Sequence, residues 1–331
     1  MTMHTRRQMI GFAAGAGVAA AIGTGMPGTL AQSPEIEPTG SGWLGLTRDE
    51  WEAIAGLGVE LDELVEYPHP SVDGSTILVR YDADRVSHME IGFEGTERGG
   101  LPPEDASAVV TQALPSGWVV LDRFIVPALN REQTLYRAVS HMTDTPETDG
   151  FLALFQERDV GFGSGGELAT VVVRVTLTLP GVHTLIAEET GDPGGIGLPR
   201  EDWEDIHGPS EPAQTGDWYD SVIVPGYRLL VRFAPEEGWV SLIDARADED
   251  AAQWGEVRPL ALASLPADAV LEHTYDLPAT PEGPIALAAE LWRSESLAGM
   301  SGGSGAVFVL YQLEGGSPVV PRLSITVPVM S

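Results

Sequence analysis

The sequence predicts an α+β protein made of two tandem homologous domains, each a mainly antiparallel sheet with two or three short helices. Three observations support this fold class. The chain contains an internal repeat at a shift of 203 − 51 = 152 residues, isolated helix signals end at glycine, and apolar residues alternate at the two-residue period of strands. Helices interleaved with hairpins, without a regular βαβ spacing, favour an antiparallel sheet.

The first 31 residues have the pattern of an export signal. Arg6 and Arg7 form a twin-arginine motif, an Ala- and Gly-rich apolar stretch follows at residues 10–23, and small residues precede Ala31. We expect residues 1–31 to be a signal peptide that is cleaved after Ala31, followed by a linker at residues 32–41. The alternative is a retained anchor, although 14 apolar residues fall short of the roughly 20 that span a bilayer.

The repeat sets the domain boundaries. Residues 45–56 and 197–208 share seven of twelve residues, and Ile77–Tyr81 matches Leu229–Phe233 at the same shift. Two further matches follow in the same order, one of Leu135–Arg137 with Leu291–Arg293 and one of Arg174–Pro180 with Arg322–Pro328. We therefore predict repeat domain 1 at residues 42–180, a Gly- and Pro-rich linker at 181–194, and repeat domain 2 at 195–331.

Each repeat is predicted to open with a short helix. In the first repeat Thr47 and Glu50 have the spacing of a capping box, and Gly56 ends the helix. In the second, Pro199 lies in the first turn and Gly208 follows the last turn. Trp51 and Trp203 occupy the apolar face of these helices, so we expect both in the core, with ligand stacking as the alternative.

The later elements are assigned from periodicity and turn residues. A second helix is expected in each repeat, over residues 103–113 and 248–263. The remaining apolar runs are predicted to be strands, at residues 77–81, 89–93, 118–126, 151–155, 171–179, 239–245, 306–313 and 323–329.

Composition excludes several classes of function. The 18 basic residues, all arginine, face 49 acidic residues, for a formal net charge of −31, so binding to nucleic acid or to an anionic membrane surface is not expected. The chain has no cysteine, which removes disulfides, lipid-acceptor thiols and thiolate metal sites. We expect no metal, no cofactor and no stable membrane insertion after signal cleavage.

Familiar catalytic motifs are missing. The Gly-rich segments at residues 161–166 and 301–305 lack the pattern of a nucleophile elbow or of a phosphate-binding loop, which predicts flexible loops. The six histidines outside the signal region show no metal-ligand spacing, although a Ser-His-Asp triad assembled across the fold stays possible on sequence alone.

One polar pair is retained by the repeat. Arg80 and Arg232 occupy the same position of the matched strand. An ion pair with the acidic surface would explain them structurally, and an anion- or partner-binding edge presented twice is the functional alternative.

The repeated Gly-Leu-Thr/Pro-Arg-x-x-Trp-Glu-x-Ile-x-Gly segment, followed by Val-Arg-Tyr/Phe, resembles uncharacterised exported bacterial proteins with tandem LTRxEWE-like repeats. More distantly, a helix ending in glycine before antiparallel strands resembles β-lactamase-inhibitor-like and small outer-membrane lipoprotein A-like modules, which bind proteins. The resemblance implies a binding role, and it transfers no functional residue.

The sequence therefore favours a non-enzymatic protein- or ligand-binding module, exported by the twin-arginine pathway to an extracellular, cell-surface or periplasmic location. Another extracytoplasmic protein is the expected partner. The alternative is an extracellular or envelope hydrolase with a site between the two repeats, whose catalytic residues the sequence does not name. A stress-associated cell-surface protein is a third possibility.

Overall fold

The computed structural model describes most of the chain beyond the N-terminal 41 residues. The described residues are 42–97, 99–114, 118–127, 135–142, 150–162, 168–181, 195–213, 215–235, 238–248, 250–277, 285–314 and 317–328. Arg6, Arg7 and Ala31, together with the predicted signal peptide and both linkers apart from Gly181, lie outside them.

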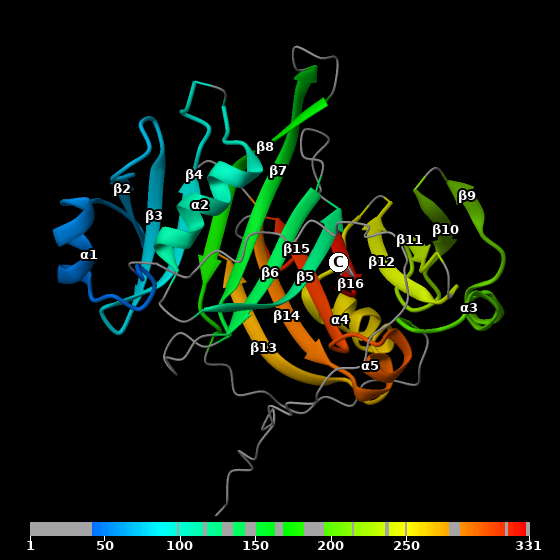
Figure 1. Cartoon of the computed structure of the whole chain (residues 1–331). Coiled ribbons are helices and arrows are strands. Elements are labelled where there is room, and N and C mark those ends of the chain that lie inside the picture. Colours follow the sequence, from blue (N-terminus) through cyan, green and yellow to red (C-terminus); the bar gives the residue numbers. More distant parts are fainter. Residues whose placement is uncertain are drawn as a thin grey trace, which may run out of the picture. The chain divides into compact units, whose positions relative to one another are not determined.

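The first domain is a helix and four strands followed by a second helix and four strands (Figure 1). Its sheet runs β1-β2-β3-β4-β8-β7-β6-β5, and every neighbouring pair is antiparallel. The elements are α1 (Arg48–Ala55), β1 (Val59–Leu61), β2 (Leu64–Pro68), β3 (Thr76–Asp82), β4 (Arg85–Gly92), α2 (Pro103–Ala113), β5 (Val119–Pro127), β6 (Leu135–Met142), β7 (Leu152–Phe162) and β8 (Leu168–Thr178).

The second domain has the same order of elements, with one extra helix, α5, between its sixth and seventh strands, β14 and β15. Its sheet runs β9-β10-β11-β12-β16-β15-β14-β13, again antiparallel throughout. The elements are α3 (Arg200–His207), β9 (Glu211–Ala213), β10 (Gly216–Asp220), β11 (Tyr227–Phe233), β12 (Val240–Ala247), α4 (Trp254–Ala263), β13 (Val270–Leu277), β14 (Ile285–Arg293), α5 (Glu295–Ser301), β15 (Ala306–Glu314) and β16 (Arg322–Thr326).

Local capping explains where the first helices begin and end. Thr47 is the N-cap of α1, the capping box with Glu50 forms as predicted, and Gly56 follows the last turn with φ of +84°. In α3 the prediction was off by one position, because Pro199 is the N-cap rather than a first-turn residue. Gly208 ends that helix with φ of +80°, a conformation that favours glycine.

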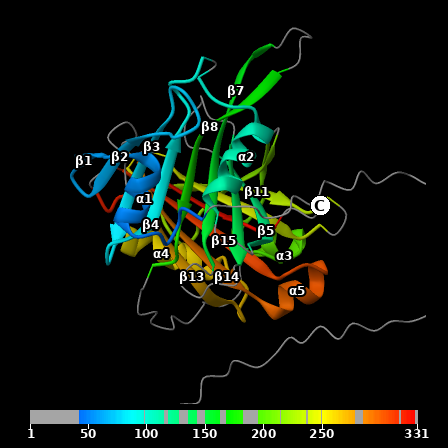
Figure 2. The ribbon, with the colours of Figure 1, turned by 60° about the vertical axis from the view of Figure 1, so that its left-hand side comes forward.

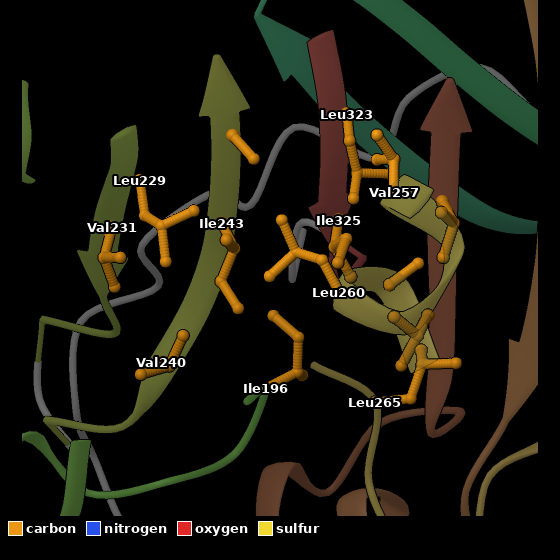
Figure 3. Close-up of a cluster of buried hydrophobic side chains, with 14 of the residues drawn as sticks. Ile196, Leu229, Val231, Val240, Ile243, Val257, Leu260, Leu265, Leu323 and Ile325 are labelled. Atoms are coloured by element: carbon orange, nitrogen blue, oxygen red, sulfur yellow. The ribbon is translucent and has the colours of Figure 1, made fainter. Parts of the chain in front are cut away.

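Each domain buries its own core between its helices and one face of its sheet. Helix α2 lies against β8 in the first domain (Figures 1 and 2). In the second, Val257 and Leu260 of α4 point toward side chains of β11, β12 and β16, including Ile243 and Ile325 (Figure 3). Trp51 and Trp203 are fully buried, which confirms their predicted place in the core.

A third core joins the two sheets. Phe124 and Val126 of β5 and Leu152 and Leu154 of β7 pack with residues of β13, β14 and β15, including Phe308. In β7 and β15 alternate side chains pack in different cores. Residues 153 and 155 of β7 face the first-domain core, and residues 307, 309 and 311 of β15 face the second-domain core. Burial on both faces explains why β15 reads as a nearly continuous apolar run.

The predicted α+β class is wrong, because antiparallel sheet dominates the described residues. Two eight-stranded sheets hold about half of them, and the five helices have only 7 to 11 residues each. The sequence prediction missed β1, β2, β6, β9, β10, β13 and β14, and it placed six extra residues in a helix at 248–253. Strands β1, β2, β9 and β10 have only three to five residues and β13 is a sheet edge, where the two-residue period is weak. Strands β6 and β14 are longer and lie inside their sheets, so neither reason explains why they were missed.

One predicted repeat match is also wrong. Leu135 begins β6 opposite Pro127, at the end of β5. Arg293 ends β14 opposite Val270, at the start of β13. The two segments therefore lie at opposite ends of corresponding strands, and three similar residues were too few to set the register.

Candidate functional site

A pocket of about 750 Å³ lies where β5 of the first domain meets the second domain, and we call it the interdomain pocket. One wall is β5. The other consists of the β11–β12 connection, the end of α5 with the segment after it, and the residues that follow β16. The apolar residues that line it include Leu121, Ile125, Ala234, Trp239, Leu242, Leu297 and Val327.

Strand β5 presents two different faces. Phe124 and Val126 are fully buried in the core between the sheets. On the opposite face Leu121 is 43% exposed and Ile125 is 37% exposed, and Arg123 lies between them. Because successive side chains of a strand alternate, one short segment both joins the domains and lines the pocket.

Asp122 fixes the β5 wall to the second domain. Its carboxylate accepts hydrogen bonds from the hydroxyl of Ser304 and, at 3.3 Å, from the guanidinium of Arg293. Arg293 also forms two hydrogen bonds with Glu272, at 3.1 and 2.8 Å. Burial by itself would lower the pKa of Arg293, but Glu272 and Asp122 raise it above its usual value. This network, in which only Asp122 is buried, connects the β5 wall to the second domain.

Helix α5 is fixed by a second carboxylate. Asp268 accepts hydrogen bonds from the hydroxyls of Ser294 and Ser296, at 2.6 and 2.7 Å, and from the backbone N–H of Ser296. Burial would raise the pKa of Asp268, but these three hydrogen bonds outweigh it and lower the pKa to about 2. Ser294 is also the N-cap of α5, so the pocket wall begins at a well-defined helix start.

The Ser- and Gly-rich segment at residues 301–305 has a definite structure, which corrects the prediction of a flexible loop. Gly302 ends α5 with φ of +67°, and Gly305, with φ of +71°, brings the chain into β15. A side chain at Gly305 would collide with the carbonyl oxygen of Ser294, at 2.1 Å. The glycines therefore serve the tight turn that carries Ser304 to Asp122.

The pocket hydroxyls are all used as donors to the protein. Ser301 donates to the carbonyl of Leu297 at 2.8 Å, Ser241 to the carbonyl of Arg232 at 3.2 Å, and Ser304 to Asp122. No histidine lines this pocket. Among its described lining residues there is thus no serine paired with an imidazole base.

Arg80 and Arg232 occupy equivalent places in their sheets but differ in surroundings. In both domains a register shift follows the arginine, and a serine of the next strand, Ser87 or Ser241, donates to its carbonyl. Arg80 lies opposite the fully buried His88. Arg232 lines the interdomain pocket, and its Nε donates to the carbonyl of Thr215 at 2.7 Å.

Sequence reasoning therefore named one candidate site residue that lines the pocket, Arg232, and missed Asp122 and Arg123. It also missed Arg293, which pairs with Asp122. Asp122 and Arg293 are 171 residues apart, so no motif spacing could have connected them. The only available signal was local, an acidic and a basic residue within an otherwise apolar strand at residues 119–127.

Within the described residues, no group of three His, Asp or Glu side chains is placed to hold a metal ion. The same part of the chain contains no helix with the length and apolar character needed to cross a membrane.

Comparison with known proteins gives no family for this chain. No family model matches it, and no curated protein matches it. Among solved structures, a trans-AT PKS dehydratase domain from Brevibacillus brevis is 13% identical and covers 83% of this chain and 98% of its own length, with a TM-score of 0.13. At that TM-score the likeness carries no argument about fold or activity.

Proposed function

We propose that the chain is a non-enzymatic binding module that is exported by the twin-arginine pathway and binds a protein or ligand outside the cytoplasm. The interdomain pocket is the observation that supports binding. Its volume of about 750 Å³ falls within the roughly 300–1,000 Å³ that is usual for ligand sites. Two of its apolar side chains, Leu121 and Ile125, are partly exposed, and a bound ligand that removes them from water gains favourable free energy.

The duplicated architecture is consistent with this proposal. We infer that two homologous domains arose by tandem duplication, and the equivalent sheet orders support that inference. The pocket lies at the junction, so its walls come from different strands of the two copies. A site of this kind needs no catalytic group in either copy.

The hydrolase alternative would use the same pocket. Its one supporting contact is that of Ser304 with Asp122. The carboxylate is also paired with Arg293, and it accepts the serine hydrogen bond without an imidazole between them. An activated serine needs a free base in that position, so we favour binding.

The binding proposal is tested by changing the exposed pocket wall. Purified protein is mixed with the proteins and small molecules of its native culture medium, and retained species are identified by native mass spectrometry. Leu121→Glu with Ile125→Glu should reduce retention at least ten-fold. Val222→Glu with Ile223→Glu is the matched control, because these residues are 59% and 38% exposed and do not line the pocket. Equal retention by all three proteins, or none by wild type, contradicts the proposal.

A panel of ester, peptide and glycan substrates separates the two functions. The binding module should show no turnover above buffer. Turnover by the wild type that is lost in Ser304→Ala, with an unchanged melting temperature, would establish the hydrolase instead.

A further inference from the structure

Strand β5 is an unpaired edge of the first sheet. The sheet order ends at β5, whose described strand partner is β6. Among the described residues, the backbone of β5 makes no hydrogen bond to any other segment. An edge strand exposes alternate N–H and C=O groups, which form a template for another extended chain.

This edge is unusually apolar. Val119, Leu121 and Ile125 are three of the eleven large hydrophobic residues that are exposed in the described chain. The edge strands β1 and β13 each have one, Val59 and Val270, and β9 has none. Edge strands ordinarily carry charged residues or proline that prevent pairing. Strand β5 carries one exposed charge, Arg123, and ends at Pro127, but its three exposed apolar side chains make it the most apolar of the four sheet edges, which favours an edge that a partner covers.

The charge around β5 favours an acidic partner. Arg123 and Arg232 line the interdomain pocket, and neither forms an ion pair with a described carboxylate. The one acidic residue in the pocket lining, Asp122, is paired with Arg293. The pocket lining is thus locally positive in a chain of net charge −31. Two copies of so acidic a chain repel each other, which disfavours self-association.

We propose that β5 binds an extended segment of a partner protein, which adds to the first sheet as a ninth strand. The segment places a carboxylate beside Arg123, with an apolar side chain on either side facing Leu121 and Ile125. Main-chain hydrogen bonds supply affinity, and alternate side chains supply specificity. This inference rests on the proposed binding function, and it names the partner chemistry and the mode of binding.

A synthetic peptide tests the mode of binding directly. The probe is fluorescein-labelled Thr-Val-Thr-Glu-Thr-Val-Thr with blocked ends, whose Val, Glu and Val share one face when the peptide is extended. Fluorescence anisotropy should show saturable binding. Methylating alternate backbone nitrogens, in two peptides that cover both registers, should weaken at least one of them ten-fold or more. This arm uses only the wild-type protein.

A charge exchange tests the residue assignment. Arg123→Glu should weaken the Glu peptide at least ten-fold and should strengthen binding of the matching peptide with Lys in place of Glu. Arg85→Glu is the control, since Arg85 is an exposed strand arginine outside the pocket. Circular dichroism of each variant verifies that it is folded. Recovery by the Lys peptide cannot come from a folding defect.

The remaining outcomes overturn the inference. If both methylated peptides bind as tightly as the unmethylated peptide, strand addition is excluded. If decanoate then also displaces the probe, the pocket is assigned to small apolar carboxylates. If the peptide fails to bind while Leu121→Glu with Ile125→Glu still abolishes retention of native species, strand addition is wrong and the binding function stands. If both experiments are negative, both proposals fail.

Discussion

Each domain buries one ion pair between its fourth strand and its last strand. Glu90 of β4 pairs with Arg174 of β8 at 2.8 Å, and Asp244 of β12 pairs with Arg322 of β16 at 2.5 Å. The second pair is the more deeply buried, with side chains 0% and 2% exposed. Ser324 also donates to Asp244, at 3.1 Å. A carboxylate with this many donors depends on all of them, because water cannot replace a missing one.

Removing Arg322 should therefore be costly. Arg322→Met should lower the free energy of unfolding by up to about 3–5 kcal/mol, because it removes the buried partner of Asp244 and leaves only Arg246, whose side chain is 42% exposed, to compensate the carboxylate. Arg228→Met is the control, since Arg228 pairs with Glu211, whose side chain is 77% exposed, and should cost about 0–1 kcal/mol. Urea unfolding followed by tryptophan fluorescence measures both. Equal losses for the two variants would show that burial of the pair has no energetic effect.

His88 makes stability dependent on pH. Burial, and then the positive charge of Arg80, lower the pKa of His88 from 6.5 to about 3. Below pH 6.5 His88 is protonated in the unfolded chain but stays neutral in the folded chain, so the free energy of unfolding decreases as the pH falls towards 3. Between pH 7.5 and 5 this amounts to about 2 kcal/mol.

The second sheet indicates the substitution that removes this effect. Leu242 lies opposite Thr326 as His88 lies opposite Thr178. His88→Leu should reduce the loss of stability between pH 7.5 and 5 by about 2 kcal/mol, measured by urea unfolding at each pH. His69, whose pKa burial lowers to about 4, acts in the same direction in both proteins and leaves the difference unaffected. A pH dependence unchanged from wild type would mean that His88 is not the responsible group.

At the scale of elements, the two opening helices differ in one cap. Thr47 accepts a hydrogen bond from the backbone N–H of Glu50 in α1, whereas Pro199 offers α3 no side-chain cap. Thr47→Ala should destabilise the protein by about 1 kcal/mol, because a backbone donor loses its partner. Pro199→Ala has no cap bond to remove and is the comparison. Thermal unfolding by circular dichroism should give the lower midpoint for Thr47→Ala.

Sequence alone could predict those elements whose signals are local. The capping box of Thr47, the burial of Trp51 and the strand around Val79 follow from neighbouring residues, and the structure confirms them. Strands β10 and β13 were missed, because polar residues such as Asp217 and His273 interrupt their apolar pattern. Their pairing with neighbouring strands supplies what local preference does not.

The site was less predictable than the fold. Arg232 was found because the repeat retains it, and the alternative hypothesis placed a site between the two repeats, but the repeat does not indicate which other residues form a pocket there. Asp122 meets Ser304 across 182 residues of sequence, through the packing of β5 on the second domain. Such contacts depend on the arrangement of whole domains, which no local pattern encodes.

At the scale of the whole molecule, β5 couples the two domains. Phe124 of β5 stacks on Phe308 of β15, with ring centroids 5.1 Å apart and an interplanar angle of 26°. Asp122 adds the polar contact to Arg293 on the same face of β5. Since this strand also lines the pocket, the packing that joins the domains also positions the proposed docking edge.

A double-mutant cycle measures this coupling. Phe124→Leu and Phe308→Leu should each cost on the order of 1 kcal/mol, and together they should cost less than the sum, by about 0.5–1.5 kcal/mol, because either one already breaks the stacked pair. Phe93→Leu with Phe308→Leu is the control cycle, since Phe93 lies in the first-domain core and should be additive within about 0.5 kcal/mol. Urea unfolding provides all the values. An additive result for Phe124 and Phe308 would mean that the domains gain nothing specific from this contact, and the β5 edge would then be held mainly by Asp122 and its partners.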